Sequence, residues 1–289
     1  MFRSFEKKLT SIDLQQVDDK ISLHSKYIKS ATNLTFCNLT INVPDFLKKH
    51  AYSNEISSNM FHFALMNKYN HLILEQNAIP LIKLNPSPDE ITSDSNFTVD
   101  EDFIIATDSN YRAPRIQYDD AILALPYTGL HLANLSVFEK TYKLNPEAFN
   151  NSILNFKSAL DFMLFPTPMV NNSHILELVW SGYIKRIVAS KSNAVNDLTP
   201  HIPDGLRARI YSNHWGLDSN LKDFLSITHL SSHFAYKQLH GGLCLYFIVD
   251  KANIRRICSK FNEDFKLPLI NIGLLDQGNL GDKVTIDLF

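Results

Sequence analysis

A run of seven apolar residues, LCLYFIV at 243–249, is the feature that most restricts how this chain can fold. Its length and its content of branched and aromatic residues are typical of a strand that is buried on both faces. The segment that follows, 251–265, has an apolar stripe at helical spacing and polar residues elsewhere. It therefore predicts an amphipathic helix that packs on the sheet containing this strand.

The rest of the last third continues this alternation. Strands are predicted for GLRARIYS (205–212), LPLINIGLL (267–275) and KVTIDLF (283–289), and a helix for LDSNLKDFLSI (217–227). The resulting order, β-α-β-α-β-β, indicates an α/β (α+β) layer in which helices cover one sheet.

The patterns before residue 204 are weaker. They predict helices over about 11–30 and within 45–69, strands at 71–76, 80–84 and 103–110, an exposed acidic loop at 85–102, and a helix at 174–191. A helix predicted at 152–165 ends at Pro166 and Pro168, which cannot continue it. We place the domain boundary there, which gives an N-terminal domain of residues 1–165 and a C-terminal domain of residues 166–289.

Charge, cysteine content and hydropathy restrict the partners and the compartment. The chain has 28 basic and 30 acidic residues, so no overall field attracts nucleic acid or an acidic membrane. No apolar run approaches the roughly 18 residues of a membrane span. The three cysteines are an odd number and form no C-x-x-C pair, which favours a reducing compartment. We expect a soluble intracellular protein, cytoplasmic or in an organellar matrix, with no membrane insertion and no specific nucleic acid.

Several residues have the type or spacing of functional groups, but the sequence around them favours structural roles. His229 and His233 have the i, i+4 spacing of some zinc ligands, yet no cysteine pair or H-E-x-x-H motif supports a metal site, and none is predicted. Gly241 and Gly242 are expected to start a strand and to allow close packing rather than to contact phosphate. Two small basic faces are expected to be solvated helix surface, and they comprise Lys185, Arg186, Lys191, Arg255, Arg256 and Lys260.

The C-terminal segments also occur in a familiar order: DLTPHIPDGLRARI (197–210), NHWGLDSNLKDFL (213–225), LHGGLCLYFIV (239–249) and INIGLL (270–275). This series resembles the aminoimidazole ribonucleotide synthetase family, also called phosphoribosylformylglycinamidine cyclo-ligase. PTPMVNNSHIL (166–176) is similar to that family's entry to its second domain. The matching positions are Pro203, Gly205, Leu206, Ala208, Ile210, Trp215, Gly242 and Gly273.

The resemblance implies the two-domain architecture of that family. Its N-terminal sheet domain, resembled here from about residue 72, pairs across a dimer, and its C-terminal domain is an α/β layer. In the N-terminal part the similarity rests on ATDSNYRA (106–113) and YDD (118–120). By this resemblance the nucleotide-binding candidates are Thr107, Asp108 and Asp119, whereas no catalytic residue can be assigned.

The departures from the family pattern concern the positions that contact phosphate. After Thr107 and Asp108, the glycines and the lysine of the family's T-D-G-V-G-T-K turn are replaced by residues 109–113. The family's T-G-G-G element becomes Ser190, Lys191, Ser192 and Asn193, whose side chains stand where bare backbone would meet a substrate.

These losses lead to three hypotheses. The first is a catalytically inactive synthetase-like protein that serves as a structural or scaffolding subunit, in a homodimer or larger complex, with no cofactor. The alternative is a divergent ATP-dependent cyclo-ligase of purine biosynthesis that forms aminoimidazole ribonucleotide with ATP and magnesium. A third is a sensor that binds another small molecule in the emptied cleft.

Overall fold

The structure is a computed structural model of the chain. It describes the backbone of residues 2–8, 33–42, 80–84 and 98–107, and most side chains within 113–126, 141–164, 178–179, 181–190, 193–238, 240–278 and 281–287. The chain forms two compact units, Met1–Ala113 and Pro114–Phe289. The expected helices over 11–30 and 45–69 and the expected strand at 71–76 lie outside the described residues.

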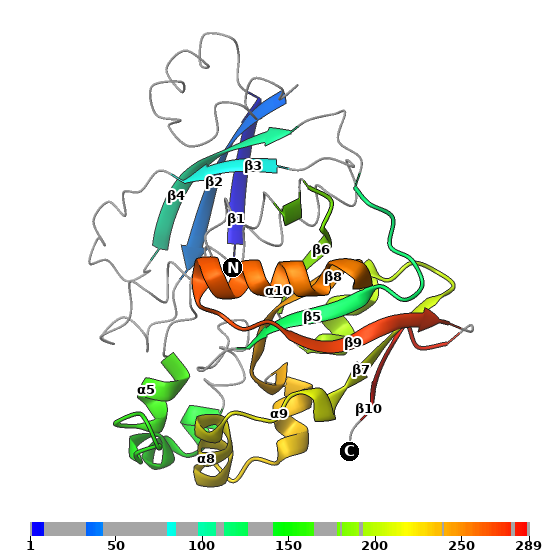
Figure 1. The fold of residues 1–289 in the computed structure, drawn as a ribbon. Coiled ribbons are helices and arrows are strands. Elements are labelled where there is room, and N and C mark those ends of the chain that lie inside the picture. Colours follow the sequence, from blue (N-terminus) through cyan, green and yellow to red (C-terminus); the bar gives the residue numbers. More distant parts are fainter. Residues whose placement is uncertain are drawn as a thin grey trace. The chain divides into compact units, whose positions relative to one another are not determined.

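The first unit contains a four-stranded antiparallel sheet in the order β1-β2-β4-β3 (Figure 1). Its strands are β1 (Phe2–Lys8), β2 (Asn33–Asn42), β3 (Pro80–Leu84) and β4 (Thr98–Thr107). The expected strand at 80–84 is confirmed as β3. β4 begins inside the segment expected to be a loop, because it pairs with β2 along its whole length, from Thr98 opposite Asn42 to Thr107 opposite Asn33.

The second unit is built on a six-stranded sheet in the order β10-β7-β9-β5-β8-β6 (Figure 1). Only the β10–β7 pair is parallel among these strands. The strands are β5 (Ala121–Pro126), β6 (Ile184–Ala189), β7 (Leu206–Tyr211), β8 (Leu243–Val249), β9 (Ile270–Gln277) and β10 (Val284–Asp287). Every residue of β8 is buried, as its apolar sequence predicts.

Helices pack on this sheet and beside it. α10 (Ile254–Phe265), preceded by the short turn η7 (Lys251–Asn253), follows β8 as expected and buries Phe261 against Phe247 at a ring distance of 5.2 Å. The core cluster on the sheet also takes in residues of α7 (Ala194–Leu198) and Trp215. The remaining helices and turns are η3 (Pro146–Asn150), α5 (Ala159–Leu164), η4 (Thr199–His201), η5 (Ser212–His214), α8 (Ser219–Ile227), α9 (Ser232–Gln238) and η6 (His240–Gly242).

The division between the units differs from the boundary expected after residue 165. β5 lies between β9 and β8 in the middle of the second sheet, so the chain enters the second unit at Pro114 rather than at Pro166. The segment AILALP is short, and the sequence analysis assigned no strand to it. Its membership in the sheet depends on pairing with residues 117 or more positions later in the chain, which local patterns do not report.

The helix expected over 174–191 is wrong for its second half, which forms strand β6. The pairing of β6 with β8 steps over Lys185, because Ile184 and Arg186 lie opposite the consecutive residues Val249 and Ile248. This bulge breaks the alternation of a regular strand, and the apolar residues Ile184, Ile187 and Val188 then acquire the spacing of a helix. The mixed α/β class with two units is otherwise confirmed.

Candidate functional site

The turn at 117–120 leads into β5 and is attached firmly to β9. The Asp119 amide donates to the Leu275 carbonyl at 2.8 Å, and the Leu275 amide donates to the Asp120 carbonyl at 2.8 Å. Asp119 has a φ of 67°, which is uncommon for a residue with a side chain. The backbone hydrogen bonds on both sides of Asp119 hold this conformation in place.

Asp119, one of the nucleotide-binding candidates of the sequence analysis, forms an ion pair. The Lys251 Nζ donates to both of its carboxylate oxygens at 2.9 Å. The side chains of Asp119 and Lys251 are 43% and 59% exposed, so the pair contributes little to stability. Its effect is local, because the ammonium group neutralises the carboxylate and occupies both of its oxygens.

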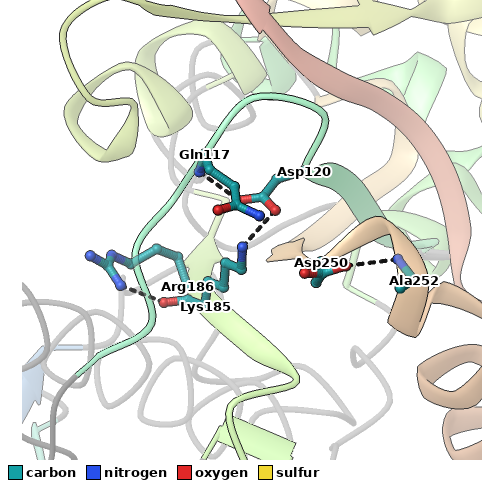
Figure 2. Close-up of polar contacts among 6 residues, drawn as sticks. All are labelled: Gln117, Asp120, Lys185, Arg186, Asp250 and Ala252. Carbon is teal, nitrogen blue, oxygen red and sulfur yellow. Dashed lines mark hydrogen bonds and ion pairs between the residues drawn. The ribbon is translucent and has the colours of Figure 1, made fainter.

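Asp120, the next residue, is buried and forms a shorter ion pair. The Lys185 Nζ lies 2.6 Å from Asp120 Oδ1, and the Gln117 amide donates to Asp120 Oδ2 at 2.8 Å (Figure 2). The two side chains are only 1% and 5% exposed. Burial raises the pKa of Asp120 above its ordinary value, and the Lys185 charge and the hydrogen bonds oppose part of this rise.

Asp250 lies at the same end of the sheet, where β8 ends. Its carboxylate accepts a hydrogen bond from the Ala252 amide at 2.8 Å and so caps η7 (Figure 2). Its negative charge also raises the pKa of Asp120. We call Asp119, Asp120, Asp250, Lys185 and Lys251 together the carboxylate–lysine cluster.

The burial of Lys185 corrects the expectation that it belongs to a solvated helix surface. The sequence analysis quoted YDD for its first aspartate and gave no role to Asp120. The position of Asp120 in the sequence could have indicated its role, because Asp120 directly precedes an apolar run that becomes a central strand. A carboxylate at such a place is buried and needs a partner.

Two of the four residues that replace the T-G-G-G element are described, Ser190 and Asn193, and both of their side chains form hydrogen bonds with α7. Ser190 is fully buried, and its hydroxyl donates to Asp197 Oδ2 at 3.3 Å. The Asn193 side chain accepts from the Asn196 amide at 2.9 Å and caps α7. Tyr246 is also fully buried next to Ser190, and burial raises its pKa. This loop therefore presents capping oxygens and a carboxylate, which disfavour a phosphate group.

Gly241 allows close packing, as expected, but Gly241 and Gly242 lie in the turn η6 that precedes β8 rather than in the strand itself. The Gly241 carbonyl accepts a hydrogen bond from Trp215 Nε1 at 3.1 Å. With a φ of 60°, Gly241 lies so close to Tyr236 that a Cβ atom would stand 2.8 Å from its ring. Trp215 and Tyr236 also contact each other edge to face at 5.7 Å.

The other predicted candidates are distributed as follows. Thr107 ends β4 in the first unit, Asp108 lies outside the described residues, and Asp119 belongs to the second unit. His229 and His233 are exposed, and in the part of the chain that the structure describes no group of three metal-ligating side chains occurs. Among the described helices, none has both the length and the apolar character needed to cross a bilayer.

Comparison with solved structures identifies the fold. Thiamine monophosphate kinase from Aquifex aeolicus matches with 16% identity, coverage of 96% of this chain and 98% of that chain, and a TM-score of 0.52. The kinase from Stenotrophomonas maltophilia matches with 14% identity, 99% coverage of both chains and a TM-score of 0.54. E. coli HypE, a hydrogenase maturation protein, matches with 11% identity, coverage of 92% and 85%, and a TM-score of 0.53.

Two further structures with this fold were solved as complexes, AaThiL with AMPPCP and TMP, and HypE with HypF, each with a TM-score of 0.52. No family model matches the sequence, and no curated protein matches it either. At these identities the likeness shows the fold alone, and the expected α/β two-domain fold is confirmed. Membership in the aminoimidazole ribonucleotide synthetase family itself stays a prediction.

Proposed function

We propose that this protein is a synthetase-fold subunit that has a structural or scaffolding role and has lost the phosphate chemistry of its fold relatives. The proposal rests on one observation above all. Lys251 Nζ donates to both oxygens of Asp119, the one described carboxylate among the nucleotide-binding candidates. Magnesium is held by protein carboxylate oxygens while it binds the phosphates of a nucleotide, and at Asp119 it would have to compete with this lysine.

The loop after β6 supports the same proposal. An anion-binding helix N-terminus offers free amide groups, whereas α7 has its Asn196 amide bonded to the Asn193 side chain. Asp197 then adds a negative charge in the first turn. A phosphate group at this loop would meet like charge and occupied donors.

The alternative function is an ATP-dependent enzyme, a divergent cyclo-ligase. The fold comparison favours it, because thiamine monophosphate kinases have this fold and AaThiL was solved with AMPPCP and TMP. In that case Asp119 would exchange Lys251 for magnesium. The resemblance names Thr107 and Asp108 as the other nucleotide-binding candidates. ATP would supply an activating phosphoryl group, and catalysis would depend on positioning and charge neutralisation.

A titration of the full chain with Mg-ATP, followed by thermal unfolding, separates the two functions. A scaffold is expected to show no nucleotide-dependent stabilisation. An active site is expected to stabilise the protein by about 2 kcal/mol or more at nucleotide concentrations near a hundred times the Kd.

Two variants sharpen this titration. Asp119→Asn removes the metal-binding charge, and Lys251→Met frees the carboxylate from its lysine. Under the scaffold proposal, Mg-ATP stabilises neither variant. A shift in the wild type that Asp119→Asn abolishes and Lys251→Met enlarges would refute the scaffold proposal and support the enzyme. A shift with another metabolite but not with ATP would refute both and favour the sensor.

A further inference from the structure

The buried Asp120–Lys185 pair connects two strands that are not neighbours. Ala121 of β5 and Ile184 of β6 both lie opposite Val249, one on each side of β8. Asp120 immediately precedes Ala121, and Lys185 immediately follows Ile184. The ion pair therefore spans the end of β8 and ties the outer strand β6 to the turn before β5.

The backbone ladder that attaches β6 to the sheet is irregular. β6 is at one edge of the six-stranded sheet, and β8 is its only partner among the described strands. The ladder between them is interrupted at Lys185, where the register steps over one residue. A bulge removes regular hydrogen bonds and redirects a side chain. Here the redirected side chain is the lysine that reaches Asp120.

The opposite edge of the same sheet is built differently and offers an internal comparison. β10 pairs with β7 without a register shift. Its ion pair, between Arg209 and Asp287, is longer at 3.5 Å and partly exposed, with side-chain exposures of 40% and 34%. Solvent can replace either partner at that edge, whereas the side chains of Asp120 and Lys185 are only 1% and 5% exposed.

We infer that the Asp120–Lys185 pair is a lock that holds edge strand β6 on the sheet. Removal of Lys185 leaves the buried Asp120 carboxylate without its counter-ion, and β6, as an edge strand, is the element that can open at least cost to let water reach it. The lock thus acts on β6 in particular rather than on the whole unit equally.

Amide hydrogen exchange of the full chain tests this inference, with β10 as the internal reference. In Lys185→Met, amides of β6 are expected to exchange about tenfold faster or more, while β10 keeps its wild-type rate. The matched control is Lys251→Met, which removes the exposed pair at the same end of the sheet. It is expected to leave the exchange of β6 unchanged.

A double variant covers the case in which Lys185→Met does not fold. Asp120→Asn combined with Lys185→Met removes both charges, so no buried ion lacks a counter-ion and folding is retained. β6 is expected to exchange faster than in the wild type here as well, because its second attachment is gone. Equal acceleration of β6 and β10, wild-type exchange of β6 in the double variant, or the same acceleration in Lys251→Met would each overturn the inference.

Discussion

The two consecutive aspartates Asp119 and Asp120 show how strongly the surroundings of a residue decide its chemistry. Both are paired with a lysine. The Asp119 pair is largely in solvent, where ions are screened and partners exchange readily. The Asp120 pair is enclosed, and burial raises the pKa of its carboxyl group. The first aspartate can therefore change its partner, whereas the second cannot do so without a structural change.

The raised pKa of Asp120 predicts that this single residue makes the stability of the protein depend on pH. The folded protein binds the Asp120 proton more tightly than the unfolded chain does, whose value is near 3.8. The resulting stabilisation is fully present below that pH and is lost as the pH rises through the folded-state pKa. Asp120→Asn removes this dependence. Urea unfolding at a series of pH values gives the free energy of unfolding as a function of pH. Between pH 3.8 and the folded-state pKa, the slope of this curve is expected to differ between Asp120→Asn and the wild type by up to about 1.4 kcal/mol per pH unit.

The charges that act on Asp120 in this experiment are Lys185 from β6 and Asp250 from the end of β8, together with the Gln117 amide. Asparagine retains an acceptor for the Gln117 amide, but it leaves the Lys185 ammonium group buried without a counter-ion. Lys185→Met and the double variant Asp120→Asn/Lys185→Met are therefore compared in the same way, because these two proteins differ only at Asp120. Superimposable pH profiles of the two proteins would contradict the prediction.

At the scale of elements, β9 can lie close to β7 because Gly273 has no side chain. A Cβ atom built at Gly273 would stand 2.1 Å from the Arg209 carbonyl oxygen, which belongs to the backbone of β7. The synthetase pattern also has glycine at this position, and the structure supplies a physical reason for it.

Gly273→Ala is expected to destabilise the protein by about 3 kcal/mol, because one of the two strands must move. Gly216→Ala is the control, since a Cβ atom there would meet nothing within 4 Å. It is expected to be neutral or to stabilise by about 0.5 kcal/mol, through a less flexible unfolded chain. Chemical denaturation of both variants measures the difference, and equal effects would show that strand spacing is not the cause.

A comparison of predicted and observed strands and helices shows which sequence patterns are reliable. β8, α8 and α10 follow the expected positions closely, because each has a strong period or a continuous apolar run. β6 was mistaken for a helix because its bulge imitates helical spacing. β5 was missed because its identity depends on strands that are distant in the chain.

At the scale of the whole molecule, the proposed scaffold role predicts a stable assembly. A relative with this fold, HypE, was solved in complex with HypF. We expect the purified full chain to have a native mass of at least twice its 33.0 kDa, independent of Mg-ATP. Native mass spectrometry with and without nucleotide measures this. A monomer that associates only when Mg-ATP is added would instead support the enzymatic alternative.

The sequence by itself determined the α/β class and the strands and helices with strong periodicity. These features depend on residue type and local spacing, which can be read directly from the sequence. Only the tertiary structure decided where the units divide, that Lys185 is buried, and which lysine pairs with which aspartate. These contacts join residues 65 and 132 positions apart, and their formation depends on sheet pairing and burial, which no local pattern contains.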